Sequence, residues 1–258
     1  MSIAATSQVE LGVTAPVARL KLINPPLNVI DLAMMRELRQ ALSEVESRTD
    51  VSTIVFQGSA RAFSAGVDIK AHVPGQIHEM LTSFHAVIRA IAASRKVTIA
   101  AVRGACLGGG AELAAVCDMV YTARDAIWGF PEIKLGCYPP VAAAILAPLI
   151  GQKRATELIV TARQFSGDEA ATMGLATRSV KAVDVESVIG ETVAKLSGLS
   201  AAALAHSKKA IYAWEGMHLE KGLARAEKIY LEELALTADA REGIAAFLEK
   251  RPPRWTGK

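Results

Sequence analysis

The first half of the chain alternates between segments with strand patterns and segments with helix patterns. Val17–Leu22 places apolar and polar residues in turn, as in a half-buried strand, whereas Val51–Gln57 and Val97–Val102 are rich in β-branched and apolar residues, as in buried strands. Apolar positions recur with helical spacing from Asp31 to about Arg48 and over Ile77–Ala93. This order predicts an α/β fold in which helices cover a mostly parallel sheet.

Two glycine-containing segments interrupt this pattern and are expected to be loops. They are Gly58–Gly66 and Gly104–Gly110. The second is followed by an expected helix over Ala111–Cys117 and a short strand at Met119–Tyr121.

The second half of the chain has a different character, because its remaining segments all have helical spacing. The expected helices are Ala142–Leu149, Lys153–Thr161, Gly167–Met173, Val183–Leu196, Ala201–Trp214, Met217–Leu236 and Asp239–Lys250. We place a boundary near Ser197, with a core of residues 1–197 and a C-terminal helical subdomain of residues 198–258.

Composition and charge narrow the class of protein. Of 258 residues, 51% are hydrophobic and 21% are charged, which is typical of a globular protein. The net charge is only +3, from 29 Lys and Arg against 26 Asp and Glu, so we expect no nucleic-acid partner. The first basic residue is Arg19, and apolar runs reach only about ten residues. We therefore expect no signal peptide, no membrane span and a cytoplasmic location.

Cysteines and histidines give no sign of a metal site. Cys106, Cys117 and Cys137 lack the paired spacing of zinc ligands or of a disulfide framework, so we expect buried thiols. The five histidines show no metal-binding spacing; His78 and His85, seven residues apart on one helix face, could at most line a pocket.

Two segments have the composition of a site that binds a ligand through backbone groups. Ala62–Lys70 passes through small residues and Gly66 before a helical turn, and Val102–Glu112 carries three consecutive glycines where a strand meets a helix. Such loops let backbone N–H groups approach a ligand closely. The second segment lacks the Lys-Ser/Thr of a phosphate loop, so an oxyanion hole fits better. An ordinary turn and close helix–strand packing remain the structural alternatives.

Glu112 and Glu132 are the candidate acid and base. Glu112 is placed in the first turn of the helix after the glycines, and Glu132 has aromatic and apolar neighbours that would raise its pKa. Each alone reads more readily as a structural carboxylate. Two carboxylates near an oxyanion hole, however, are suited to activate a water and deliver a proton.

Together these segments resemble the crotonase (enoyl-CoA hydratase/isomerase) superfamily along nearly the whole chain. The resemblance rests on Asn24–Asn28, Phe63–Ile69, Gly108–Ala114, Phe165–Ala170, Met173–Leu175 and Glu242–Arg251, which occur in the family's order. It implies a ββα spiral with a C-terminal helical trimerisation region, homotrimers or homohexamers, and an acyl-CoA thioester as substrate.

The same resemblance implies roles for individual residues. The backbone N–H groups of Val67 and Gly109 match the oxyanion hole. Glu112 would activate water, and Glu132 would deliver a proton to carbon. The residues matched to CoA or substrate binding are Ser64, Ala65, Val67, Asp68, Ile69, Lys70 and Tyr138. No metal or redox cofactor is expected, since coenzyme A is part of the substrate.

One departure from the straight-chain hydratases concerns the acyl pocket. Where those enzymes continue with Pro-Gly and further glycines, this chain has Cys137-Tyr138-Pro139-Pro140. This run looks most like the cyclic dienoyl-CoA hydratases of anaerobic benzoyl-CoA breakdown. They convert cyclohexa-1,5-diene-1-carbonyl-CoA to 6-hydroxycyclohex-1-ene-1-carbonyl-CoA.

Three other functions remain open. A straight-chain enoyl-CoA hydratase also needs both glutamates, whereas a Δ3,Δ2-enoyl-CoA isomerase needs only one carboxylate, so Glu112 argues against an isomerase. A non-catalytic acyl-CoA or RNA-binding member of the fold is disfavoured by the pair of glutamates and by the mild charge.

Overall fold

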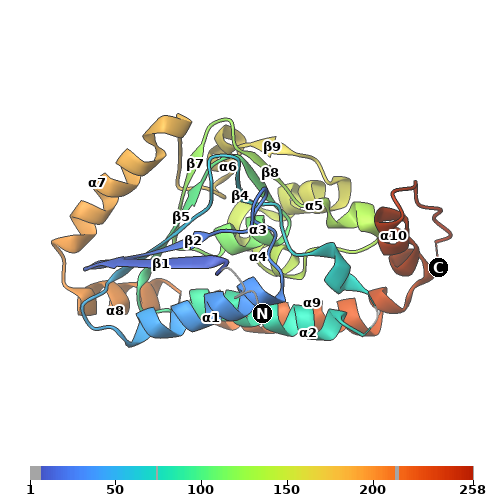
Figure 1. Ribbon diagram of the computed structural model, residues 1–258, viewed down its shortest axis with the longest axis horizontal. Helices are drawn as coiled ribbons and strands as arrows, with labels where there is room; N and C mark the ends of the chain where they lie inside the picture. Colours follow the sequence, from blue (N-terminus) through green and yellow to red (C-terminus); the bar gives the residue numbers. More distant parts are fainter. Residues whose placement is uncertain (1–6, 74, 213–214, 258) are drawn as a thin grey trace, which may run out of the picture.

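The computed structural model describes residues 7–73, 75–212 and 215–257. Two sheets and the helices around them make up this part of the chain (Figure 1). Helices α1 and α2 lie together below the strands in this view, and α7 stands on the other side of them. The expected α/β class is confirmed.

The larger sheet has the strand order β1-β2-β3-β5-β7-β10. Its strands are β1 Val9–Thr14, β2 Val17–Leu22, β3 Thr53–Gln57, β5 Val97–Val102, β7 Met119–Ala123 and β10 Arg178–Val180. Only β1 pairs antiparallel with its neighbour, and the other pairs are parallel. Every residue of β5 is buried because helices cover both faces of the sheet there, as its apolar sequence predicts.

The smaller sheet was not predicted from the residue pattern. It has the order β4-β6-β8-β9 and is built from β4 Ala62–Ser64, β6 Ala105–Leu107, β8 Ile127–Gly129 and β9 Phe165–Ser166. Strands β4 and β6 lie inside the two segments expected to be loops, so that expectation is wrong. The expectation of helices alone after residue 142 is also wrong, since β9 and β10 lie there. Strands of two or three residues are too short to show the alternation that predicts a strand.

The helices largely follow the expected ranges. They are α1 Leu32–Ser47, α2 Ile77–Ala93, α3 Gly109–Ala115, α4 Pro140–Ile150, α5 Gln152–Thr161, α6 Gly167–Met173, α7 Val185–Ser197, α8 Ala201–Ile211, α9 Glu215–Glu232 and α10 Ala238–Leu248. Short 3-10 turns occupy η1 Ile69–His72, η2 Pro131–Leu135, η3 Ala182–Asp184 and η4 Leu234–Leu236. The predicted end of one helix at Trp214 lies outside the described residues.

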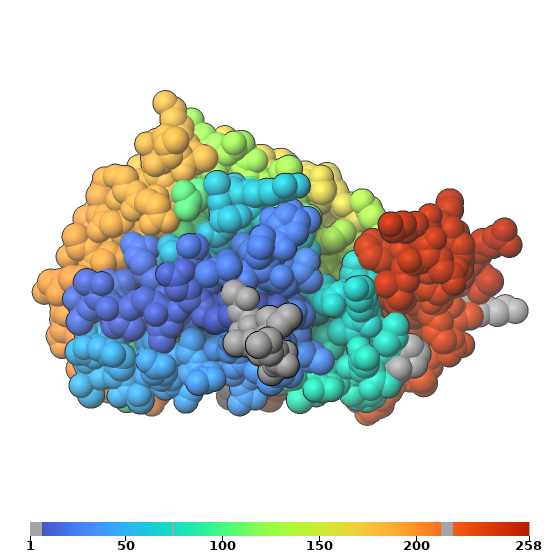
Figure 2. All heavy atoms as spheres, in the orientation of Figure 1, coloured from blue at the N-terminus to red at the C-terminus, as the bar shows by residue number. Residues whose placement is uncertain are grey.

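The helices after Ser197 pack directly on the core. On α8, the ammonium of Lys208 forms a buried ion pair with Asp118 at 2.8 Å, and α9 contacts both α2 and α4. In Figure 2 the C-terminal residues, in red, form one end of the molecule beside the turquoise segment that contains η1 and the start of α2. A separate C-terminal subdomain stays a prediction.

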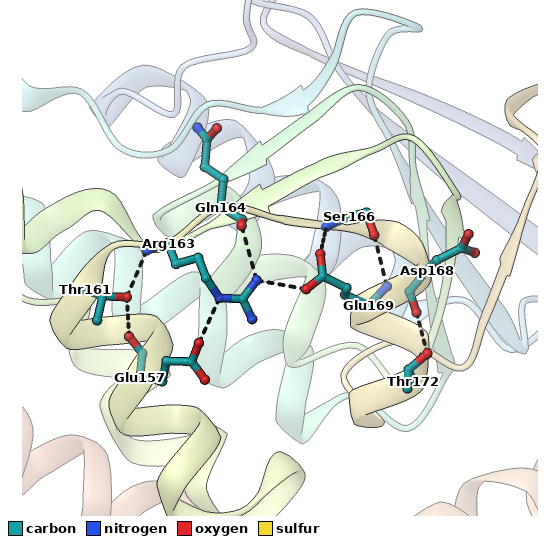
Figure 3. Close-up of polar contacts among 8 residues, drawn as sticks. All are labelled: Glu157, Thr161, Arg163, Gln164, Ser166, Asp168, Glu169 and Thr172. Carbon is teal, nitrogen blue, oxygen red and sulfur yellow. Dashed lines mark hydrogen bonds and ion pairs between the residues drawn. The ribbon is translucent and has the colours of Figure 1, made fainter.

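The junction between α5 and α6 is held by side chains that satisfy backbone groups (Figure 3). Ser166 and Glu169 form a capping box at the start of α6, each accepting a hydrogen bond from the other's backbone N–H. The guanidinium of Arg163 bridges Glu169 at 2.8 Å and Glu157 at 2.9 Å. This local polar chemistry explains why the helix predicted at Gly167 begins there.

All three cysteines are free and buried, as expected. No single helix of the described ranges is both long and apolar enough to cross a membrane, although the bent pair Ala182–Ser197 and Ala201–Ile211 passes a test of length and composition together.

Candidate active site

The loop after β4 presents the N–H of Val67 without a partner. On either side of it, the carbonyl of Gly66 accepts from Ile30 at 2.9 Å, and the N–H of Asp68 donates to the carbonyl of Ile30 at 3.1 Å. Between them, the N–H of Val67 has no acceptor among the described residues. Gly66 adopts a φ of +106°, which favours glycine and turns the chain here.

The start of α3 presents a second free N–H beside the first. Gly109 is the first helical residue, so its N–H has no acceptor within the helix. A Cβ atom added to Gly109 would lie 2.7 Å from Cγ2 of Val67 and 3.4 Å from its nitrogen. Only glycine permits this approach, which places the N–H groups of residues 67 and 109 next to each other.

Glu112 lies in the first turn of α3 and is 3% exposed. Its Oε1 accepts a hydrogen bond from the N–H of Ala142, in the first turn of α4, at 2.9 Å. Burial raises the pKa of Glu112 to about 7, although the backbone N–H groups of Ala142 and Val141 act in the opposite direction. Those donors favour the ionised carboxylate.

Glu132 lies on η2, and its carboxyl group is less well satisfied. Its Oε2 is buried and has no hydrogen-bond partner within the described part of the chain. Burial, reinforced by the charge of Glu112, raises the pKa of Glu132 to about 8. A Cβ atom on Gly108 would lie 2.6 Å from Oε1 of Glu132, so the glycine loop leaves room for the carboxyl group.

One narrow cavity of about 80 Å³ unites these groups. Its walls include Val67, Gly109, Glu112 and Glu132. An adjoining cavity of about 480 Å³, lined mainly by apolar residues of η4, α9 and α10, shares His72 and Tyr230 with it. The narrow cavity thus combines two N–H donors and two carboxyl groups next to a larger apolar space.

Tyrosine and proline side chains form another wall of the narrow cavity. The hydroxyl of Tyr138 donates to the carbonyl of Ala226 at 2.6 Å, and burial raises its pKa to about 12. Its ring meets that of Tyr230 edge to face, with 5.3 Å between centroids. Pro139 and Pro140 continue the wall. Three residues of the run Cys137–Pro140 therefore line the site directly.

The sequence-predicted binding residues divide into two groups. Ala65, Val67, Ile69 and Tyr138 line the narrow cavity. Ser64, Asp68 and Lys70 do not line it: Ser64 is buried behind the loop and accepts from the N–H of Gly66 at 3.1 Å, Asp68 caps η1, and Lys70 is exposed. Contact of these three with CoA stays a prediction.

Two further side chains, neither of them among the predicted binding residues, line the narrow cavity. Tyr230 lies against both cavities. His85 is fully buried on α2 and lines the narrow cavity beside the glutamates. The sequence allowed His85 to line a pocket, and the structure confirms that it does.

Comparisons with known proteins agree with this geometry. The model of the enoyl-CoA hydratase/isomerase family matches residues 12–258. A cyclohexa-1,5-dienecarbonyl-CoA hydratase of Thauera aromatica is 36% identical over 244 residues, 93% of each chain, and a probable enoyl-CoA hydratase of Mycobacterium bovis is 38% identical over 232 residues, 89% of this chain and 90% of the relative.

Solved structures show the same fold. An enoyl-CoA hydratase from Mycobacterium avium subsp. paratuberculosis superposes with a TM-score of 0.86 at 26% identity, covering 96% of this chain and 98% of that one. One from Bacillus anthracis gives 0.78 at 29% identity, covering 97% and 100%. The chain belongs to the enoyl-CoA hydratase/isomerase family, and its fold is that of the crotonase superfamily, as expected.

Proposed function

We propose that this protein is an enoyl-CoA hydratase, a hydro-lyase that adds water to a conjugated acyl-CoA thioester. The observation that carries the proposal is the pair of buried carboxyl groups, Glu112 and Glu132, in one cavity with the N–H groups of Val67 and Gly109. The family match supports the same class of reaction.

The two N–H groups stabilise charge on the substrate. When water attacks the carbon β to the thioester carbonyl, negative charge develops on the thioester oxygen. Donors from Val67 and Gly109 are fixed by the backbone and need no reorganisation to meet that charge. One such donor typically lowers the barrier by about 3–4 kcal/mol.

Each of the two carboxyl groups carries out one of the two proton transfers. Glu112, which accepts from Ala142, is suited to be the carboxylate that removes a proton from water. Glu132, whose Oε2 has no partner among the residues described, is suited to hold the proton that passes to carbon. The water O–H bond breaks, a C–O and a C–H bond form, and transfer of the proton from Glu112 to Glu132 restores the starting state.

For the substrate we propose cyclohexa-1,5-diene-1-carbonyl-CoA, giving 6-hydroxycyclohex-1-ene-1-carbonyl-CoA in anaerobic benzoyl-CoA degradation. Oxygen adds at ring carbon C2, β to the carbonyl, and the resulting dienolate takes its proton at C5, opposite C2 in the ring. Identity to the Thauera aromatica enzyme supports this choice. So does the narrow wall of Tyr138, Tyr230 and prolines, which suits a flat ring.

A straight-chain enoyl-CoA hydratase is the second candidate, favoured by identity to the Mycobacterium bovis relative. The purified protein should be given cyclohexa-1,5-diene-1-carbonyl-CoA and crotonyl-CoA in parallel. Faster hydration of the cyclic diene supports the proposed substrate. Faster hydration of crotonyl-CoA would favour the straight-chain substrate instead. If the protein hydrates neither ester, the proposed activity is overturned.

The proposal also covers the binding of the rest of the acyl-CoA and the need for a cofactor. The larger cavity offers room for the parts of an acyl-CoA beyond the reacting carbons. The reaction needs no metal or redox cofactor, because both proton transfers have a carboxyl group available.

We also propose that the protein is cytoplasmic and forms a homotrimer or homohexamer. An apolar cavity of about 410 Å³ lies near α4 and α9 and is lined in part by Ala144, Leu149 and Leu219. This cavity suits contact with another subunit.

A further inference from the structure

His85 is held by a chain of charged groups that reaches back from the narrow cavity. Its Nδ1 lies 2.5 Å from Oε1 of Glu227 on α9, and its side chain is completely buried. The same Oε1 accepts from the guanidinium of Arg89 at 3.1 Å, and Arg89 also reaches Glu220 at 3.3 Å. The imidazole ring is therefore fixed in orientation by a partner that is itself paired.

The opposite ring nitrogen of His85 has no partner in the part of the chain that the structure describes. Nε2 is buried and makes no hydrogen bond to any described residue. His85 lines the same narrow cavity as Glu112 and Glu132. A buried polar atom without a partner is unfavourable, so one in a cavity of this kind points to a ligand or water that completes it.

The partner of Nδ1 determines what Nε2 offers. Burial and the charge of Arg89 together lower the pKa of His85 more than Glu227 raises it, so the imidazole is neutral near pH 7. The carboxylate of Glu227 can only accept, which places the ring proton on Nδ1. Nε2 then carries a lone pair and is a hydrogen-bond acceptor.

We propose that Nε2 of His85 accepts a hydrogen bond from the oxygen that is added to the acyl group, as attacking water in hydration and as the new hydroxyl in the reverse direction. This inference rests on the proposed hydratase function. The acyl carbons and the thioester oxygen of an enoyl-CoA offer no donor, whereas the attacking water and the new hydroxyl each carry one. A water that gives one O–H to Glu112 has its second O–H left for His85.

The test compares two ligands that differ only in that hydroxyl. Affinities for 3-hydroxybutyryl-CoA and butyryl-CoA are measured by titration calorimetry for the wild-type protein and for His85→Phe. We expect His85→Phe to weaken the binding of 3-hydroxybutyryl-CoA by about 5- to 20-fold and that of butyryl-CoA by less than about twofold. His206→Phe, at an exposed histidine on α8, is the matched control and should change neither affinity.

A second variant keeps the test valid if His85→Phe does not fold. Glu227→Gln preserves shape, but its amide can donate to Nδ1, which moves the ring proton to Nε2 and removes the acceptor. Glu227→Gln should therefore also weaken the binding of 3-hydroxybutyryl-CoA more than that of butyryl-CoA. Equal weakening of both ligands, or none, would overturn the role of His85. Failure of the wild-type protein to hydrate either cyclohexa-1,5-diene-1-carbonyl-CoA or crotonyl-CoA would instead overturn the proposed function itself.

Discussion

The N–H of Ala142 donates to Oε1 of Glu112 at 2.9 Å, and this bond joins the first turn of α4 to the first turn of α3. Among the described residues, Glu132 has no comparable donor at its buried Oε2. Two glutamates in one cavity therefore differ in their surroundings, and the difference favours a carboxylate at residue 112 and a carboxylic acid at residue 132.

Replacing either glutamate with glutamine should remove most of the activity while leaving the fold intact. The Glu112→Gln side chain would keep an oxygen for the Ala142 bond but could not accept a proton, and the Glu132→Gln side chain could not donate one to carbon. We expect kcat for crotonyl-CoA to fall about 10²- to 10⁴-fold in each variant. Glu191→Gln, at an exposed position on α7, is the control for loss of charge. Unchanged turnover in either active-site variant would contradict the assignment.

The raised pKa values also predict how stability depends on pH. Because the pKa values of Glu112 and Glu132 rise from 4.5 to about 7 and about 8 on folding, the folded protein binds more protons than the unfolded chain between these limits. Stability of the wild type should therefore fall, relative to Glu132→Gln, as pH rises from about 5 to about 8. Urea unfolding of both proteins at several pH values measures the difference. A difference that stays constant with pH would refute the raised pKa.

Long and short elements differ in how well sequence predicts them. The range of α2 follows from helical spacing and that of β5 from a continuous apolar run, since each is long enough to show its period. Strands β4 and β6 have three residues each and pair mainly with other short strands, so their pairing partners, rather than their own residues, define them.

In the candidate site, too, some residues have a local sequence pattern that predicts them and others do not. Glu112 and Glu132 stand out because each adjoins a glycine loop or an apolar run that is visible in the sequence. The pairing of His85 with Glu227 joins residues 142 positions apart and has no local signature. Likewise, the hydroxyl of Tyr138 finds its acceptor at Ala226, which only the packing of α9 reveals.

The close approach at Gly109 gives a steric test of the oxyanion hole. A methyl group at this position would lie 2.7 Å from Cγ2 of Val67 and 3.1 Å from the ring of Phe84, so Gly109→Ala must displace the side chain of Val67, next to the N–H of the oxyanion hole. We expect kcat to fall about 10- to 10³-fold. Gly190→Ala on α7 meets nothing within 4 Å and should leave activity unchanged while stabilising the helix by about 0.5–1 kcal/mol. Equal activities in the two variants would contradict an oxyanion hole at this position.

Tyr138 should determine the preference for a ring over a chain. Tyr138→Phe keeps the aromatic wall and loses only the bond to Ala226, so the ratio of rates for the cyclic diene and crotonyl-CoA should change less than about threefold, with a loss of about 1 kcal/mol in stability. Tyr138→Ala removes the wall and should lower that ratio at least about tenfold. Parallel assays with both esters measure the ratio of rates. An unchanged ratio in Tyr138→Ala would show that Tyr138 does not determine the preference for a ring.

The central claim is that the protein adds water to a conjugated acyl-CoA, and isotope incorporation tests it most directly. The purified protein is incubated with cyclohexa-1,5-diene-1-carbonyl-CoA in deuterium oxide, and the product is analysed by mass spectrometry and proton magnetic resonance. We predict a product that gains one hydroxyl oxygen and one carbon-bound deuterium, on the ring carbon opposite the new hydroxyl. A product with no added oxygen, or unchanged diene and equally unchanged crotonyl-CoA, would contradict the claim.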